Sequence, residues 1–81
     1  MKQRIKKSER VVSKLMKEFK KIRKERGFSH EKVASLTGLH RTTIGLLESE
    51  KRVPTILTCL KISSALEVQL YDLLKKVSNS N

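Results

Sequence analysis

The polar side chains of the segment 41–49 have the types and the spacing that read base edges in duplex DNA. Arginine can bond two acceptor atoms of a guanine edge, and threonine can bond a base or touch the methyl group of thymine. Arg41 could instead hold a phosphate, because over half of protein–DNA hydrogen bonds go to the backbone, and one of the two threonines could do the same. Gly45 would let DNA approach closely. The base-contact candidates are Arg41, Thr42, Thr43, Leu46 and Ser49.

A second group of side chains has the chemistry that holds phosphate. Ser29 and His30 stand at an expected helix start, where free backbone N–H groups bind anions. A histidine in contact with phosphate would make binding pH dependent in the ordinary histidine range, although a solvated histidine without a role is an equal alternative. For the two cations that follow the segment 41–49, the alternative role is solubility alone. The expected phosphate contacts are Ser29, His30, His40, Lys51 and Arg52.

Arrangements for catalysis or for metal binding are absent from the sequence. Two histidines and one cysteine supply too few ligands for a metal cage, and no Ser-His-Asp set or carboxylate pair can be placed on one helix face. We therefore expect no enzyme activity, no cofactor, no metal and no small-molecule ligand. Cys59 cannot form an internal disulfide, so we expect it in the core of a protein of the reducing cytoplasm. No apolar stretch approaches the length of about 18 residues that a membrane span needs, so no membrane partner is expected.

The charge balance favours a polyanion as the partner. Lysine and arginine number 19 against 8 acidic residues, which gives a net charge of +11, and most of the excess lies in residues 1–26. Two phenylalanines, one tyrosine and no tryptophan leave too few rings to stack single-stranded bases. Duplex DNA is therefore the expected nucleic acid. A chain of 81 residues forms one domain with limited burial, so a second copy would add stability.

Apolar periodicity predicts a single all-α domain of five helices over residues 9–77. Residues 1–8 are predicted to be a flexible basic arm, and residues 78–81 a loose tail. Ser8 is the expected cap of the first helix. The arm could follow the DNA backbone or enter the minor groove, although most basic tails are merely mobile. Its cations are Lys2, Arg4, Lys6, Lys7 and Arg10.

A helix-turn-helix is predicted in the middle of the chain. Ser29 can cap a short helix over residues 30–37, and a turn that contains Gly38 separates this helix from another over residues 41–49. The apolar residues of the second helix are expected to face the core. A helix presented across such a turn can enter the major groove of DNA, which is about 12 Å wide.

Two further helices complete the predicted fold. Thr55 can cap the fourth helix. The residues of this helix expected to be buried are Ile56 or Leu57, Leu60, Ile62 and Leu66. The last helix carries more apolar positions than one core contact needs, which predicts the surface of a homodimer. The residues of that surface are Leu70, Tyr71, Leu74 and Val77.

Four motifs in a row resemble the lambda-repressor-like family of DNA-binding domains, also called the Cro/C1 or XRE family. They are FKKIRKERGFS, HEKVASLTG, LHRTTIGLLESEKRVP and TILTCLKISSALEV, and the resemblance covers roughly residues 15–75. The resemblance implies an all-α fold with a helix-turn-helix. It also implies a transcriptional regulator, expected to be a repressor, that binds a palindromic operator as a homodimer. Within the family, the extended first helix and the lack of an appended domain resemble restriction–modification controller proteins.

The resemblance also assigns roles to individual residues. The family pairs an arginine of its first helix with an acid near the end of its third, which implies a partly buried salt bridge between Arg23 and Glu48 that fixes the recognition helix. An exposed charge is the alternative for Glu48. The family commonly has glutamine at the position of His30, where the side chain meets a phosphate. Lys51 and Arg52 resemble the family's phosphate-contacting loop.

A protein-binding role is the second functional hypothesis. An antitoxin that masks a toxin would bind DNA only secondarily, and it would leave an apolar surface open to its partner. The candidates extend the apolar stripe of the first helix, and their alternative role is packing on the last helix. They are Val11, Val12, Leu15 and Met16.

Overall fold

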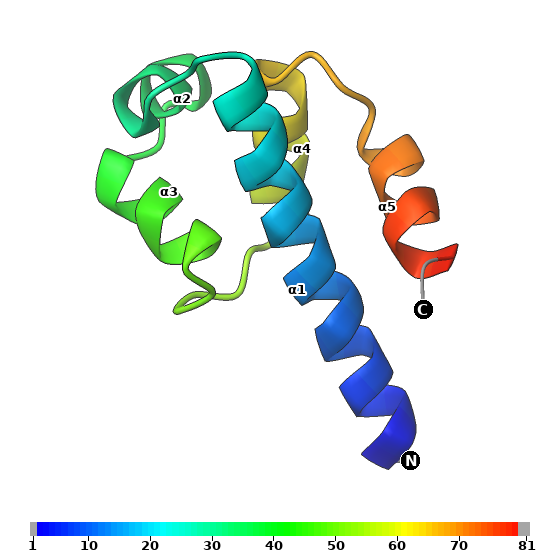
Figure 1. The fold of residues 1–81 in the computed structure, drawn as a ribbon. Coiled ribbons are helices and arrows are strands. Elements are labelled where there is room, and N and C mark those ends of the chain that lie inside the picture. The colour runs from blue at the N-terminus through cyan, green and yellow to red at the C-terminus, as the bar shows by residue number, and fades with distance from the viewer. Residues whose placement is uncertain (1, 80–81) are drawn as a thin grey trace.

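The computed structural model describes the backbone of residues 2–79 and the side chains of residues 6–79. The described part of the chain consists of helices and connecting loops, without strands, which confirms the predicted all-α fold (Figure 1). None of the helices within it is long and apolar enough to cross a membrane. The helices are α1 (Lys2–Glu25), α2 (His30–Thr37), α3 (Arg41–Glu48), α4 (Ile56–Ala65) and α5 (Leu70–Asn79).

Side-chain caps and one glycine set three of the helix boundaries. Ser29 precedes α2 and its Oγ accepts a hydrogen bond from the backbone N–H of Lys32 at 3.0 Å. Gly38 ends α2 in the left-handed conformation, with φ 77°, which glycine adopts without steric cost. Thr55 caps α4 in the same way as Ser29 caps α2. All three boundaries were predicted from the sequence and are confirmed.

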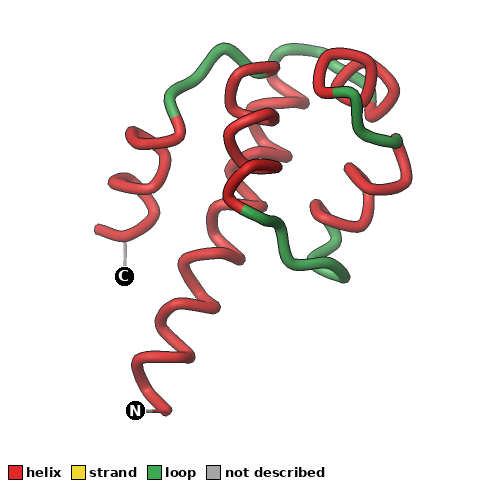
Figure 2. The backbone as a smooth tube through the Cα atoms, turned by 180° about the vertical axis from the view of Figure 1, so that it is seen from behind, coloured by secondary structure: helices red, strands yellow, loops and turns green. Residues whose placement is uncertain are grey.

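The start of α1 differs from the prediction. The helix begins at Lys2, so the expected start at Ser8 is wrong, and residues 2–8 continue α1. Lysine, arginine and glutamine are good helix formers, and an existing helix extends without the cost of a new nucleus. The amino-terminal half of α1 therefore projects beyond the other helices (Figures 1 and 2). At the other end, α5 includes residues 78 and 79 of the expected loose tail, whereas residues 80 and 81 lie outside the described residues.

All five helices contribute to the core, with α1 packed on α3 and α5, and α4 packed on α2 and α5. Phe19 of α1 is 3% exposed, and Leu66, directly after α4, is fully buried. Cys59 is buried as predicted, and this burial raises the pKa of its thiol. The buried hydrophobic residues are Leu15, Met16, Phe19, Val33, Ile44, Leu47, Cys59, Ile62, Leu66, Leu70, Leu73 and Val77.

The prediction for α4 is wrong for three of its apolar residues. Ile56, Leu57 and Leu60 are 66%, 58% and 51% exposed, although the sequence analysis expected this stripe to be buried. The core instead takes the neighbouring arc of the helix, at the spacing i, i+3, i+4 and i+7. That arc consists of Cys59, Ile62, Ser63 and Leu66. The buried Ser63 is accommodated because its hydroxyl donates to the Cys59 carbonyl at 2.7 Å. An apolar face on α4 is left open.

Most apolar residues of helix α5 pack against the core of the same chain. Leu70 and Val77, which the sequence analysis placed on a dimer surface, are buried in the core. Leu74 is half-buried and packs against the same core. Tyr71 is the remaining member of the predicted surface, and it is 72% exposed. Because the long α1 offers α5 a wide apolar surface, the wrapped apolar pattern of α5 needs no second chain to explain it.

Candidate nucleic-acid interface

Helices α2 and α3 pack against each other across the Gly38 turn and lie on one side of α1 (Figure 1). Their outward surfaces border a shallow hollow. It is lined by His30, Glu31, Arg41, Thr42, Gly45, Leu46, Ser49 and Lys51. The hollow thus brings together four of the five base-contact candidates and two of the five phosphate candidates from the sequence analysis.

The core fixes the orientation of α3. Ile44 and Leu47 are each 2% exposed and anchor its inner side. Burial of both side chains contributes roughly 1.5–3 kcal/mol each, which is large for a helix of only eight residues. The opposite side of α3 is therefore held toward solvent, as a helix that enters a DNA groove must be.

The remaining candidates lie around the hollow. Thr43 is half-buried, and its Oγ1 accepts a hydrogen bond from the Arg52 guanidinium at 3.4 Å, so these two side chains are turned to one another. His40 is exposed and precedes α3 without making a side-chain cap. Ser29 uses its hydroxyl to cap α2. Of these four, His40 keeps both ring nitrogens outside any hydrogen bond among the described residues, so it can meet a ligand without rearrangement.

An exposed ion pair occupies Arg41. Its Nη1 lies 3.3 Å from Glu31 Oε2, a contact between α3 and α2 that the sequence analysis did not anticipate. The backbone N–H of Glu31 and then the Arg41 guanidinium lower the pKa of the Glu31 carboxyl. Exposed pairs of this kind contribute little to stability, so Arg41 can exchange Glu31 for a base or a phosphate at small cost.

The salt bridge between Arg23 and Glu48 is present, as the family resemblance implied. Arg23 Nε donates to Glu48 Oε2 at 2.6 Å and Nη2 donates to Oε1 at 3.0 Å, so the contact is bidentate. The side chains of Arg23 and Glu48 are only 11% and 9% exposed. Arg23 Nη1 also donates to the carbonyl of Phe28 at 2.7 Å. The guanidinium therefore joins the end of α3 to α1 and to the loop before α2.

The electrostatics of Glu48 follow from its partners. Burial alone would raise the pKa of the Glu48 carboxyl, but hydrogen bonds from Arg23 and His30 outweigh this effect and lower it. Glu48 is therefore an anion at neutral pH. Its partners Arg23 and His30 lie on α1 and α2, so the carboxylate joins the end of α3 to two other helices.

His30 contacts Glu48, which the sequence analysis missed. Its Nε2 lies 3.1 Å from Glu48 Oε1, across 18 positions of sequence. The ring still lines the hollow, where a phosphate contact was expected. No local sequence signal announces this contact, because it depends on how α2 and α3 pack.

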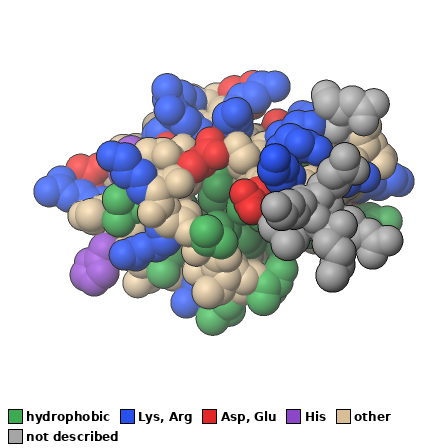
Figure 3. Space-filling view, turned by 90° about the horizontal axis from the view of Figure 1, so that it is seen from below, with side chains coloured by type: hydrophobic (Ala, Val, Ile, Leu, Met, Phe, Trp, Pro, Cys, Tyr) green, Lys and Arg blue, Asp and Glu red, His purple; other side chains and the backbone are tan. Residues whose placement is uncertain are grey.

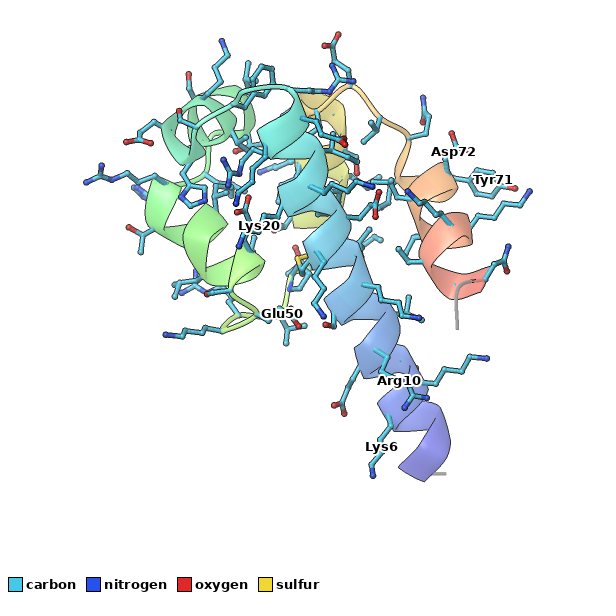
Figure 4. All side chains as sticks on the ribbon, in the orientation of Figure 1. Lys6, Arg10, Lys20, Glu50, Tyr71 and Asp72 are labelled. Atoms are coloured by element: carbon cyan, nitrogen blue, oxygen red, sulfur yellow. The ribbon has the colours of Figure 1, made fainter. Side chains whose placement is uncertain are left out.

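The projecting half of α1 carries the cations of the predicted arm. Lys6, Lys7 and Arg10 are exposed, while the side chains of Lys2 and Arg4 lie outside the described ones. Figure 4 shows Lys6 and Arg10 on the part of α1 that extends away from α2 and α3. These cations are therefore not part of the hollow.

Metal chemistry finds no support at this surface. Within the described side chains, no group of three or more His, Cys, Asp or Glu lies close enough together to hold a metal ion. The hollow offers hydrogen bonding and charge through a guanidinium, two hydroxyls, an imidazole, an ammonium group and the carboxylate of Glu31, from α2, α3 and the residues that follow α3.

Comparisons with known proteins agree with this geometry. The helix-turn-helix family model HTH_3 matches residues 19–73. Among solved structures, the chain is similar to the restriction-modification controller protein C.AhdI from Aeromonas hydrophila, with 28% sequence identity and a TM-score of 0.71, over 78% of this chain and 94% of that one. No curated protein sequence gave a match.

The matched family covers the whole helix-turn-helix and the helices that support it, from the second half of α1 into α5. Its XRE, or Cro/C1-like, members are DNA-binding regulators of transcription. The hollow on α2 and α3 has the residue types and the exposure that this activity requires. The chain therefore belongs to the helix-turn-helix (XRE, Cro/C1-like) family of DNA-binding transcriptional regulators.

Proposed function

We propose that this chain is a cytoplasmic transcriptional repressor that binds a palindromic DNA operator as a homodimer. The observation that carries the proposal is the hollow on α2 and α3, which gathers Arg41, Thr42, His30 and Lys51 around one exposed helix. Restriction-modification control, the role of the similar Aeromonas protein, is the proposed setting.

Direct base contact is assigned to the exposed side of α3. Arg41 and Thr42 occupy its first turn, which is the part of a recognition helix that reaches base edges. Thr43, Leu46 and Ser49 follow along the helix, with Leu46 limited to apolar contact such as a thymine methyl. The remaining polar groups take phosphates. These are the α2 amino terminus at Ser29 and His30, together with His40, Lys51 and Arg52.

The apolar face of α4 supports a second copy of the chain. Ile56, Leu57 and Leu60 lie on one arc of the helix, and Val53 in the preceding loop is exposed as well. Figure 3 shows hydrophobic side chains gathered in the lower part of the view, with most Lys and Arg side chains above and beside them. Burial of such side chains contributes about 25 cal/mol per Å².

Charge favours a second copy over DNA as the occupant of this face. Two chains that each carry +11 repel one another, so they approach most easily where charge is lowest. Lys61 is the sole charged residue of α4, and it lies at the edge of the arc of exposed apolar side chains, one turn after Leu57. A polyanion would instead bind where cations are dense.

A two-fold axis near α4 would suit a palindrome. Val53 and α4 follow directly after α3 and its loop, so a contact there would set the two recognition helices at a fixed separation. Dimeric helix-turn-helix proteins read half-sites about one helical turn apart. Linking two reading heads raises affinity by about 100-fold or more over one head.

Most of the apolar surface that an antitoxin would offer to its partner is covered within this chain. Leu15 and Met16 are packed in the core, and Val11 and Val12 are half-buried, so the stripe on α1 serves mainly the chain itself. We therefore retain DNA-dependent repression as the function. An operator occupied by the dimer excludes other proteins from the same duplex, which is the simplest route to repression.

Selection of bound duplexes from a random pool, at a stated salt concentration, tests the proposal. An enriched inverted repeat would support it, and enrichment of single half-sites or of nothing would contradict it. A reporter gene placed behind the selected site should fall in expression when the chain is supplied. The Arg41→Ala variant should lose this effect, whereas Lys75→Ala, on α5, should retain it.

A further inference from the structure

Three helices meet at the carboxylate of Glu48. Arg23 of α1 holds both of its oxygens, and His30, the first residue of α2, holds Oε1 from the other side at 3.1 Å. Glu48 is itself the last residue of α3. A shift of the recognition helix relative to α2 would therefore break the contact between His30 and Glu48.

The contact defines which ring nitrogen of His30 carries a proton. An ionised carboxylate only accepts hydrogen bonds, so Nε2 must be the donor in both the neutral and the charged ring. Nδ1 is then the atom that gains or loses the titrating proton. In the neutral ring it is an acceptor, which a phosphate oxygen repels, and in the charged ring it is a donor.

The ring edge that bears Nδ1 lies over Gly45 of α3. A Cβ placed on Gly45 would stand 3.8 Å from Cε1 and 3.9 Å from Nδ1, which is ordinary van der Waals contact. His30 and Gly45 both line the hollow. The His30 side chain is 39% exposed, and among the described residues only Nε2 has a hydrogen-bond partner, so Nδ1 is the ring nitrogen left for a ligand.

Every charged group around the ring can be named. The carboxylate of Glu48, on α3, accepts a hydrogen bond from Nε2, and Arg23 of α1 forms a salt bridge with the same carboxylate. Glu31, next to His30 on α2, is paired with Arg41 of α3, and Lys51 of the following loop lines the same hollow. With both carboxylates already paired, an incoming phosphate would be the unpaired anion nearest to Nδ1.

We propose that His30 is a positioning residue that takes up a proton at Nδ1 when a DNA phosphate enters the hollow, and that it thereby clamps the phosphate to Glu48 and the recognition helix. The inference rests on the proposed use of the hollow for DNA. Proton uptake on binding makes the affinity rise as the pH falls, because the charged ring is favoured in the bound state. The contact between His30 and Glu48 of α3 and the contact between His30 and the DNA phosphate would then strengthen together.

Binding to a fluorescently labelled, random-sequence duplex tests the proposal, because phosphate contacts do not depend on sequence. Affinity is measured at constant ionic strength between about pH 6 and pH 8, the range in which histidine titrates. Wild-type affinity should be about 5-fold or more higher at the lower pH. The His30→Gln variant can still donate to Glu48 but has no proton to take up, so it should keep the helical circular dichroism and lose the rise in affinity.

The other histidine is removed from the comparison. His40 is assigned a phosphate contact of its own, so both chains are measured in a His40→Gln background, in which His30 is the one histidine left. An affinity of the His40→Gln chain that does not change with pH would overturn the proposal. So would a pH dependence that persists in full when His30→Gln is added. A chain that selects no operator would defeat the proposed function, yet this comparison would still decide the role of His30.

Discussion

The guanidinium of Arg23 holds the carboxylate of Glu48 through two hydrogen bonds, of 2.6 Å and 3.0 Å, although the two residues stand 25 positions apart. Both side chains are largely removed from solvent. Removing a charge from such a pair leaves the other without its partner, which costs more than the pair itself contributes. A substitution in this salt bridge should therefore disturb α3, the proposed recognition helix, more than a substitution in an exposed ion pair.

Glu48→Gln should lower the free energy of unfolding by about 3 kcal/mol, because Arg23 would keep its charge and lose its counter-ion. Urea denaturation followed by circular dichroism measures this loss. The matched control is Glu25→Gln, at the exposed end of α1, which should change stability by less than about 0.5 kcal/mol. Equal midpoints for wild type and Glu48→Gln would contradict a stabilising bridge.

Acid should remove the contribution of Glu48 to stability. The pKa of its carboxyl is lowered in the folded chain, so the group stabilises the fold at every pH above its unfolded value, about 4.3. That contribution declines as the pH falls below this value and through the lower folded pKa. The difference in unfolding free energy between wild type and Glu48→Gln should therefore be constant near neutrality and shrink below about pH 4. A difference that grows on acidification would reverse the assigned sign.

Local signals predicted the helix-turn-helix well. Ser29, Gly38 and Thr55 act on the few residues next to them, through a cap or a left-handed turn, so their effect is visible in the sequence. The buried positions of α3, Ile44 and Leu47, also follow from simple periodicity. The pairing of Arg23 with Glu48 came from the family resemblance, since no local rule joins residues so far apart.

Long-range packing decided the features that were missed. Helix α4 offers two overlapping apolar arcs, and the packing of α4 on α2 and α5 determines that Cys59 is buried while Leu60 is exposed. The apolar pattern of α5 fits a dimer surface and an intrachain contact equally well until the length of α1 is known. His30 has two possible partners, a phosphate and Glu48, and sequence alone cannot reveal the second.

Gly45→Ala and Gly38→Ala should change stability in opposite directions. Gly45 is inside α3, and an added methyl group would make only ordinary contact with His30, so the better helix former should add about 1 kcal/mol. Gly38 has φ 77°, where alanine is strained, so the same change there should cost about 1–2 kcal/mol. Thermal unfolding distinguishes the two. Gly45→Ala should also bind DNA more weakly, because its methyl group stands in the hollow.

The Leu57→Ser, Leu60→Ser double variant should dissociate the proposed dimer and leave each chain folded, since both leucines are exposed in the single chain. Sedimentation at micromolar concentration measures the assembly, and binding to the selected palindrome should weaken by about 100-fold. Tyr71→Ser is the comparison, because Tyr71 lies on α5, on the far side of α1 from α3 (Figure 4). Dissociation by Tyr71→Ser instead would move the interface from α4 to α5.

Lys51→Gln should reduce the salt dependence of DNA binding. Lys51 lines the hollow beside the recognition helix, and each phosphate that a cation neutralises contributes a slope of about 0.9 to the plot of log affinity against log salt concentration. The slope should therefore fall by about 0.9 per protomer, by a similar amount on operator and on random duplex, because a phosphate contact carries no sequence information. Lys75→Gln removes the same charge from α5, so any change it shares with Lys51→Gln reflects net charge alone. A phosphate contact by Lys51 is indicated only by the amount by which the slope decreases more in Lys51→Gln than in Lys75→Gln. Equal decreases in the two variants would place Lys51 outside the interface.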